Sequence, residues 1–181
     1  MPHYFYRVEN GETSTNLTLN KFDSMCVSAG GTANITTVNE GGSMYVSNGG
    51  IANSTTVNSS GLLTVSAGGT ANSTTVNNGA NLYVSSGGVA NETTVNYYGR
   101  FEVGGGVAND TTVTNWGSMF VSSGGTANRA NVNASSKLTD YSYWSISRGY
   151  LKVCPRTKKY NYCRIICIRW TNRSNNSINN I

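Results

Sequence analysis

Valine recurs along the chain in two columns whose members are 19 residues apart. The first column is Val27, Val46, Val65, Val84, Val103 and Val121, and the second is Val38, Val57, Val76, Val95, Val113 and Val132. An alanine column keeps the same spacing at Ala33, Ala52, Ala71, Ala90, Ala108 and Ala127. The spacing shortens by one residue once, at Gly104-Gly105-Gly106. This period is typical of a protein that stacks copies of one small unit.

Each repeat contains two short runs with the alternation of a β-strand. In Met44-Tyr45-Val46 the outer two side chains face one way and Tyr45 faces the other, and Thr55-Thr56-Val57 is the second run. Both runs are too short for helices and lie close to glycine pairs. One repeat cannot form a core alone, whereas stacked repeats bury one another's faces. We therefore expect an all-β fold, a parallel β-helix (β-solenoid) of about seven 19-residue coils.

Stacking in register places like residues above one another at a rise of about 4.8 Å per coil. An asparagine column would then form a ladder of amide hydrogen bonds along the stack. Its members are Asn34, Asn53, Asn72, Asn91, Asn109 and Asn128. The glycine pairs, such as Gly49-Gly50, are expected at corners that require a positive φ.

The pattern divides the chain into three parts. Residues 1–22 keep the spacing only at Val8 and Leu19, so they are expected to be a degenerate first coil or an N-terminal cap. Residues 23–139 form the repeat solenoid. At Asp140 a charge takes an inward position and the glycine pairs end, so residues 140–181 are expected to be an irregular or disordered tail.

Charge separates the repeats from the tail. Charged residues make up 12% of the chain, and its formal charge is +5. Residues 1–136 carry −3, whereas residues 137–181 carry +8. So abrupt a change suggests that the tail is read in a shifted frame, and the alternatives are a genuine C-terminal cap or a genuine basic module.

The tail offers little specific chemistry. Its basic and aromatic residues are compatible with binding single-stranded nucleic acid, but no recognised module is present, so no nucleic-acid partner is expected. Those residues are Lys158, Lys159, Arg164 and Arg169 with Tyr160, Tyr162 and Trp170. Cys154, Cys163 and Cys167 lack a fourth metal ligand nearby, and Cys26 lies far away in the repeats. We expect neither a metal nor a cofactor.

Catalysis is not expected either. His3 is the single histidine, which makes a nucleophile–histidine arrangement in the repeats implausible. The remaining route is a carboxylate pair among Glu92, Glu102 and Asp110, as in β-helices that cleave glycans. No apolar run is long enough to span a membrane as a helix.

The outward positions of the first strand run supply a candidate binding surface. Tyr45, Tyr83 and Phe120 share one outward column and form a candidate contact stripe, because exposed aromatic residues are enriched at contact sites. The alternative is that these side chains only shield the sheet.

Residues 68–77, Gly-Gly-Thr-Ala-Asn-Ser-Thr-Thr-Val-Asn, followed by Leu82-Tyr83-Val84-Ser85-Ser86-Gly87-Gly88, resemble the repeats of AIDA-type autotransporter adhesins. The resemblance covers about residues 4–139 and recurs in every repeat. It implies a right-handed parallel β-helix in a passenger domain that is secreted or displayed at the outer membrane of a Gram-negative cell. It also implies adhesion, autoaggregation or biofilm formation, with ligands on host or neighbouring cells and self-association between cells as the partners.

The resemblance further implies that a heptosyltransferase modifies serine and threonine side chains. The outward candidates are Thr37, Thr56, Thr75, Thr94, Thr112, Ser47, Ser66 and Ser85. The chain departs from the family in its four cysteines and in having no recognisable signal peptide or translocator barrel, so we expect a fragment of such a protein.

These observations favour a structural and adhesive segment of an autotransporter-type adhesin. One alternative is a truncated or degenerate gene product without independent function. The other is a β-helical module that binds or cleaves glycans.

Overall fold

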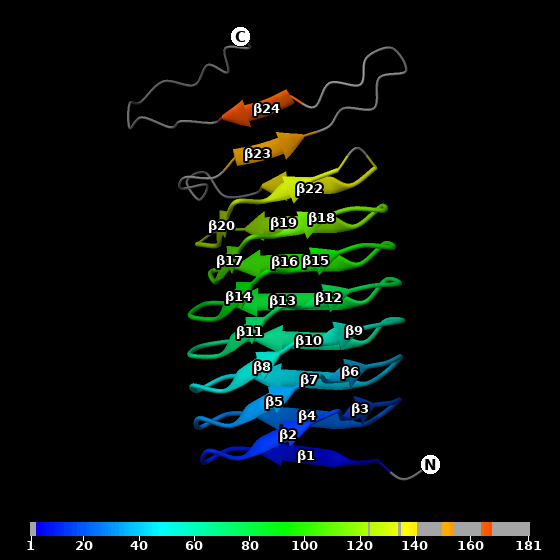
Figure 1. Ribbon diagram of the computed structural model, residues 1–181, viewed down its shortest axis with the longest axis vertical. Helices are drawn as coiled ribbons and strands as arrows, with labels where there is room; N and C mark the ends of the chain where they lie inside the picture. Colours follow the sequence, from blue (N-terminus) through cyan, green and yellow to red (C-terminus); the bar gives the residue numbers. More distant parts are fainter. Residues whose placement is uncertain (1–2, 123, 134, 141–149, 154–163, 168–181) are drawn as a thin grey trace.

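The computed structural model describes residues 3–122, 124–133, 135–140, 150–153 and 164–167. The described chain winds into stacked coils, and each complete coil consists of three short strands separated by three corners (Figure 1). The stack rises from the N-terminal coil, blue in Figure 1, toward the C-terminal strands, orange in the same view. Corresponding strands of successive coils pair with one another, so the coils build three sheets.

The first sheet contains the longest strand of each coil, and all its neighbours are parallel. Its strands are β1 (Phe5–Val8), β4 (Ser24–Val27), β7 (Ser43–Val46), β10 (Leu62–Val65), β13 (Asn81–Ser85), β16 (Arg100–Gly104), β19 (Ser118–Ser122) and β22 (Lys137–Asp140).

The second sheet contains the short strand that follows the glycine corner. Its strands are β2 (Thr13–Thr15), β5 (Thr32–Asn34), β8 (Ile51–Asn53), β11 (Thr70–Asn72), β14 (Val89–Asn91), β17 (Val107–Asn109) and β20 (Thr126–Asn128).

The third sheet contains the two-residue strands and continues into the tail. Its strands are β3 (Thr18–Leu19), β6 (Thr37–Val38), β9 (Thr56–Val57), β12 (Thr75–Val76), β15 (Thr94–Val95), β18 (Thr112–Val113), β21 (Asn131–Val132), β23 (Tyr150–Val153) and β24 (Arg164–Cys167).

Seven complete coils precede β22, which confirms the predicted all-β solenoid and its coil count. The prediction of two strands per coil was wrong, because each coil has three. The missed strand, for example β5, has Ala33 as its single inward side chain. Three residues with one small apolar side chain produce too weak an alternation to be recognised as a strand.

The core consists of columns of similar buried side chains, one from each coil, that run along the solenoid axis. The inward Met, Leu and Phe side chains of the first sheet, such as Met44 and Leu63, are completely buried, and so are the valines of the third sheet. Register keeps each column aligned, since Leu63 pairs with Met44 on one side and Leu82 on the other. Every coil thus covers the apolar face of its neighbours, as stacked repeats must.

The shortened repeat keeps this alignment. Its deletion falls in the corner at Gly104-Gly105-Gly106, and Val103 still pairs with Val84 and Val121. In the second sheet Ala108 likewise pairs with Ala90. A corner therefore absorbs the missing residue without changing the register of any strand.

The asparagine ladder forms as predicted along the second sheet. Each side-chain amide nitrogen donates to the Oδ1 atom of the asparagine in the preceding coil, at 2.8–2.9 Å. The links run from Asn53 to Asn34, Asn72 to Asn53, Asn91 to Asn72, Asn109 to Asn91 and Asn128 to Asn109.

Only the first glycine of each pair meets the predicted requirement for a positive φ. The first glycine of a pair has a positive φ, as at Gly49 (φ 81°). The second does not need one: a Cβ at Gly50 would lie 2.2 Å from the carbonyl oxygen of Val27 in the preceding coil. The second glycine is required because adjacent backbones approach too closely for any side chain.

Beyond the seventh coil, β22 still pairs with β19, and Asp140 takes the register position of Val121. The tail was expected to be irregular or disordered, and within it the structure describes two strands. β23 pairs in parallel with β21, and β24 pairs antiparallel with β23. The division into first coil, solenoid and unrelated tail stays a prediction.

Candidate functional site

The predicted contact stripe lies on the outer face of the first sheet. Tyr45, Tyr83 and Phe120 do share one outward column, but Thr64 separates the first two and Glu102 separates Tyr83 from Phe120. Successive aromatic rings are therefore two coils apart, about 10 Å at the usual strand spacing. The stripe is an interrupted row, in which Tyr45 is 42% exposed and the other two are half-buried.

Charged side chains surround the last ring of this row. The guanidinium carbon of Arg100 lies 4.2 Å from the centroid of Phe120, and Lys137 Nζ lies 5.9 Å from it. Arg100 Nη2 also donates to Glu102 Oε2 at 2.7 Å. Phe120 thus carries a cation over its ring, a favourable contact that also limits access to its face.

The hydroxyl columns expected to carry sugar do face outward. The outer side of the third sheet is lined by Thr37, Thr56, Thr75, Thr94 and Thr112. At the ends of first-sheet strands, Ser47 and Ser66 directly follow β7 and β10, and Ser85 is the last residue of β13. All eight are half-buried. The threonine before each outward one is buried, as the alternation of a strand requires. Two serines that sequence reasoning passed over, Ser54 and Ser73, are more exposed, because each is the first residue of the two-residue corner between the second and third sheets.

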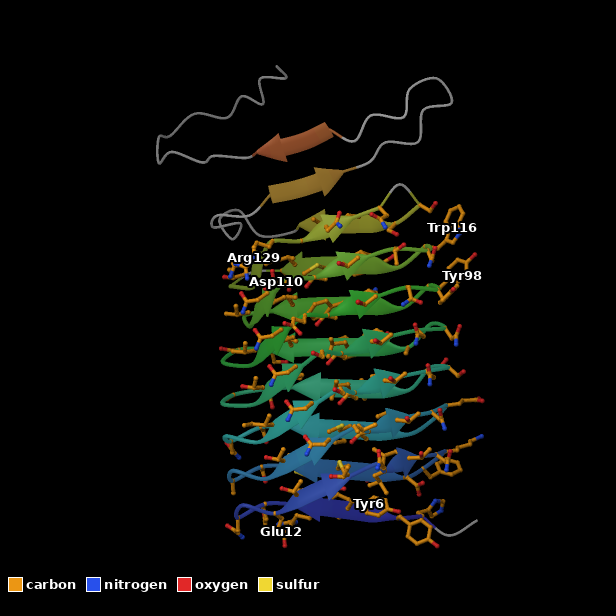
Figure 2. All side chains as sticks on the ribbon, viewed as in Figure 1. Tyr6, Glu12, Tyr98, Asp110, Trp116 and Arg129 are labelled. Carbon is orange, nitrogen blue, oxygen red and sulfur yellow. The ribbon has the colours of Figure 1, made fainter. Side chains whose placement is uncertain are left out.

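Each of the three candidate catalytic carboxylates binds a neighbouring side chain. Glu92 and Asp110 take equivalent positions of consecutive coils in this same two-residue corner, whereas Glu102 lies on the first sheet. Ser73 Oγ donates to Glu92 Oε2 at 2.8 Å. The guanidinium of Arg129 donates two hydrogen bonds to Asp110 and holds the pKa of that carboxyl below its ordinary value (Figure 2).

Other reactive residues are scattered. Among the described residues, no group of three or more His, Cys, Asp or Glu side chains could hold a metal ion. His3 packs edge-on against Phe22 at the N-terminal end, and Cys26 is unpaired. A cavity of about 440 Å³ lies beside Tyr6 and Glu12, which Figure 2 places on the N-terminal coil. The carboxylate of Glu12 is already engaged there, because its Oε2 accepts a hydrogen bond from the backbone N–H of Glu9.

The structure also shows an aromatic corner that sequence reasoning missed. Tyr97, Tyr98 and Trp116 lie in the corner between the third and first sheets, where they are 55%, 70% and 49% exposed. The rings of Tyr98 and Trp116 stack, with centroids 6.4 Å apart and planes 12° from parallel (Figure 2). A signal was available in the sequence, since Gly41, Ser60 and Gly79 occupy the position of Tyr98 in earlier repeats.

Most of the tail's candidate residues lie outside the described residues. These are Cys154, Cys163, Lys158, Lys159, Tyr160, Tyr162, Arg169 and Trp170. Arg164 and Cys167 are described only as members of β24. Every described element is a strand, so this part of the chain has no helix that could cross a membrane.

Comparison with known proteins shows that these coils are similar to adhesin repeats. Residues 5–61 match the family described as the adhesin of a bacterial autotransporter system, probable stalk. A crystal structure of a hyper-glycosylated TibA fragment, spanning residues 55–350 and modified by TibC, is 36% identical in sequence with a TM-score of 0.74. That match covers 75% of this chain and 50% of the TibA fragment, so the chain spans about half the length of that structure. No curated protein matches the chain.

Proposed function

Because its repeats resemble those of the AIDA-type autotransporter adhesin stalk, we propose that this chain is a surface-exposed structural and adhesive segment of such an adhesin. The observation that carries the proposal is the unbroken stack of seven similar coils, of which residues 5–61 match an adhesin stalk family. Such a stack projects its outer columns from a cell surface at a fixed spacing. Repeated weak contacts along it add up through multivalency.

The contact stripe is the adhesive element that we assign to this stack. Tyr45 and Tyr83 point outward from the first sheet, in a column whose members between and after them are Thr64, Glu102 and Phe120. Aromatic rings offer large contact areas at low cost in conformational entropy. Their two-coil repeat matches the same row on a second solenoid, so cells that display the chain would bind one another as well as host surfaces.

A direct test displays the whole chain on a bacterial surface through a fused translocator. Cells with the chain are expected to settle from suspension faster than cells with the translocator alone. Replacing Tyr45, Tyr83 and Phe120 together with serine should slow settling at equal display. Equal settling with and without the chain would contradict the adhesive role, and normal settling of the triple variant would contradict the stripe alone.

We also propose that a glycosyltransferase, a heptosyltransferase in this family, modifies the outward hydroxyl columns. The support is the similarity to TibA, whose fragment is hyper-glycosylated by TibC. Outward Thr75 and Ser66 are within reach of an enzyme, whereas Thr74 is 1% exposed. Co-expression of the chain with TibC followed by peptide mass spectrometry is expected to find sugar at outward positions. Sugar on Thr74, or none anywhere, would contradict this assignment.

A further inference from the structure

The aromatic corner departs from the repeat in a way that the core does not require. Tyr97, Tyr98 and Trp116 have φ values of 49°, 65° and 68°. Bulky side chains rarely adopt this left-handed region, which Gly41 and Gly79 occupy in other coils and which the ring of Phe22 shares in the first coil. What sets Tyr98 and Trp116 apart is that two consecutive coils carry this strain and their exposed rings stack, which points to a function outside the core.

Tyr98 is the more exposed of the two stacked rings. Tyr98 is 70% exposed although it stacks on Trp116. The preceding repeat has Gly79 at the equivalent position, and no atom lies within 4 Å of the point where its Cβ would be. Gly79 therefore contributes no side chain at the position that precedes Tyr98 in the column, which leaves an open step next to this ring.

A second departure occurs at the base of the same corner. In two earlier coils an asparagine at this position donates to its counterpart one coil before: Asn39 donates to Asn20 at 3.1 Å and Asn77 to Asn58 at 3.2 Å. The counterpart that would donate to Asn96 is Thr114, which has no amide group. Asn96 is 8% exposed, and its Oδ1 has no hydrogen-bond partner among the described residues. A buried acceptor thus lies at the base of the aromatic corner.

The surroundings of the corner favour a neutral, polar ligand with flat apolar faces. Asn78 and Asn115 are exposed and take the position of Tyr97 in the preceding and following coils. Arg100, which follows the corner at the start of β16, forms an ion pair with Glu102. Residues 1–136 carry −3, which disfavours a polyanion such as nucleic acid. A ligand of this kind is a sugar ring, whose C–H groups pack on the negative face of an aromatic ring while its hydroxyls bind amides.

We propose that Tyr98 and Trp116, with Tyr97 beside them, form a stacking platform for the pyranose rings of a neutral cell-surface polysaccharide. The platform deepens the adhesive function proposed above, and its biological role rests on that proposal. It lies in a different column from the contact stripe on the first sheet, so the two surfaces can be removed separately.

The test uses the full-length chain and its Tyr98→Asn/Trp116→Asn double variant. Asparagine tolerates a positive φ better than an aromatic residue, so the variant keeps the fold. Native gels cast with a mannan, a galactan or a neutral glucan measure affinity from retardation. Wild type is expected to be retarded by at least one polysaccharide, and the double variant should bind it at least tenfold more weakly.

Phe22→Asn is the matched control, because Phe22 is exposed at the same corner position in an earlier repeat, with φ 73°. Its affinity should stay within about twofold of wild type, a difference of well under 1.4 kcal/mol. Failure of wild type to bind any of the polysaccharides would overturn the proposal, and so would equal binding by the double variant.

Three further outcomes separate this platform from other functions of the corner. If sedimentation shows a wild-type dimer that the double variant loses, the corner is an interface between copies, and the glycan assignment is wrong. If cells that display the chain still aggregate while no polysaccharide binds, the platform is refuted and the adhesive function stands. If a polysaccharide binds but displayed cells do not adhere, the platform stands and the adhesive function fails.

Discussion

Two adjacent glycines at the first corner of each repeat meet different geometric demands. Gly49 supplies a left-handed backbone, and Gly50 lets the chain pass the carbonyl oxygen of Val27. The sequence predicts the corner, because paired glycines interrupt every strand pattern. It does not reveal the second demand, which comes from the coil below and not from the local turn.

These demands predict opposite tolerance at neighbouring positions. Gly50→Ala would press a methyl group against the preceding coil and should lower the free energy of unfolding by about 3 kcal/mol. Gly49→Asn should change it by less than about 1 kcal/mol, since asparagine tolerates a positive φ. Chemical denaturation of both variants measures the difference, and equal effects would contradict the close-approach explanation.

The buried threonines form a column whose hydroxyls have no partner among the described residues. Thr36, Thr55, Thr74, Thr93 and Thr111 are each 1% exposed. The sequence predicts that one threonine of each pair points inward, yet a threonine and a valine look alike at this level. Only the packed coil shows that the inward hydroxyl receives no hydrogen bond.

We expect Thr74→Val to raise the free energy of unfolding by about 1 kcal/mol, because a methyl group replaces a buried, unpaired hydroxyl. Thr75→Val is the control on the outward side and should change stability by less than about 0.5 kcal/mol. Urea denaturation monitored by circular dichroism suits both variants. A clear loss of stability in Thr74→Val would mean that the hydroxyl is bound by an internal water molecule.

The ion pair between Arg129 and Asp110, at the corner between the second and third sheets, lowers the pKa of Asp110. Hydrogen bonds from Arg129 lower the pKa of Asp110 in the folded chain. Any stability from this pair is therefore present above the ordinary pKa of an aspartate and disappears as the pH falls through the lowered value. Carboxyl NMR titration should show the pKa of Asp110 returning to its ordinary range in Arg129→Gln. Arg100→Gln, on another sheet, should leave it where it is.

At the scale of the strand, the sheets differ in what joins their coils. The first sheet is fastened by large buried side chains, whereas the second has only alanine inside and an amide ladder outside. The ladder was predictable, because asparagine recurs at the repeat spacing. The strand that carries the ladder was not predictable, because it is defined by hydrogen bonds between coils and not by an apolar pattern in the sequence.

The stability lost on removing an asparagine from the ladder should depend on the position of that asparagine in the column. Asn72 takes part in two links, one to Asn53 and one from Asn91. Asn128 is known to take part in one link among the described residues, to Asn109. Asn72→Ala should therefore cost about 2 kcal/mol and Asn128→Ala about 1 kcal/mol, at about 1 kcal/mol per hydrogen bond. Thermal and urea denaturation measure both, and a larger loss for Asn128→Ala would contradict independent links.

At the scale of the whole chain, the period alone predicted the architecture. Seven coils follow from a 19-residue repeat because each coil contacts only its neighbours, so no long-range topology remains to be guessed. The aromatic corner was not predicted, because it forms only when the corners between the third and first sheets of consecutive coils are stacked. Tyr98 and Trp116 are 18 residues apart in the sequence, yet their rings stack.

Because each coil contacts only its neighbours, a core substitution should destabilise mainly the adjacent coils. Leu63→Ala removes a buried side chain between Met44 and Leu82 and should destabilise by about 2–5 kcal/mol. Hydrogen exchange should then rise in the coils on both sides of it. Leu19→Ala, in the first coil, should raise exchange near that end only. Uniform exchange throughout both variants would show that the solenoid unfolds as a single unit.

The stacking of strands across the long axis has a mechanical consequence. Tension applied between the two ends would pull the coils apart in the direction of their hydrogen bonds, so the bonds of one interface would break in sequence and not all at once. Each released coil of 19 residues would lengthen from a rise of about 4.8 Å to about 65 Å. A cell tethered through such a chain would meet a sudden pull with a series of small extensions, and the intact coils would remain templates on which the released ones rewind.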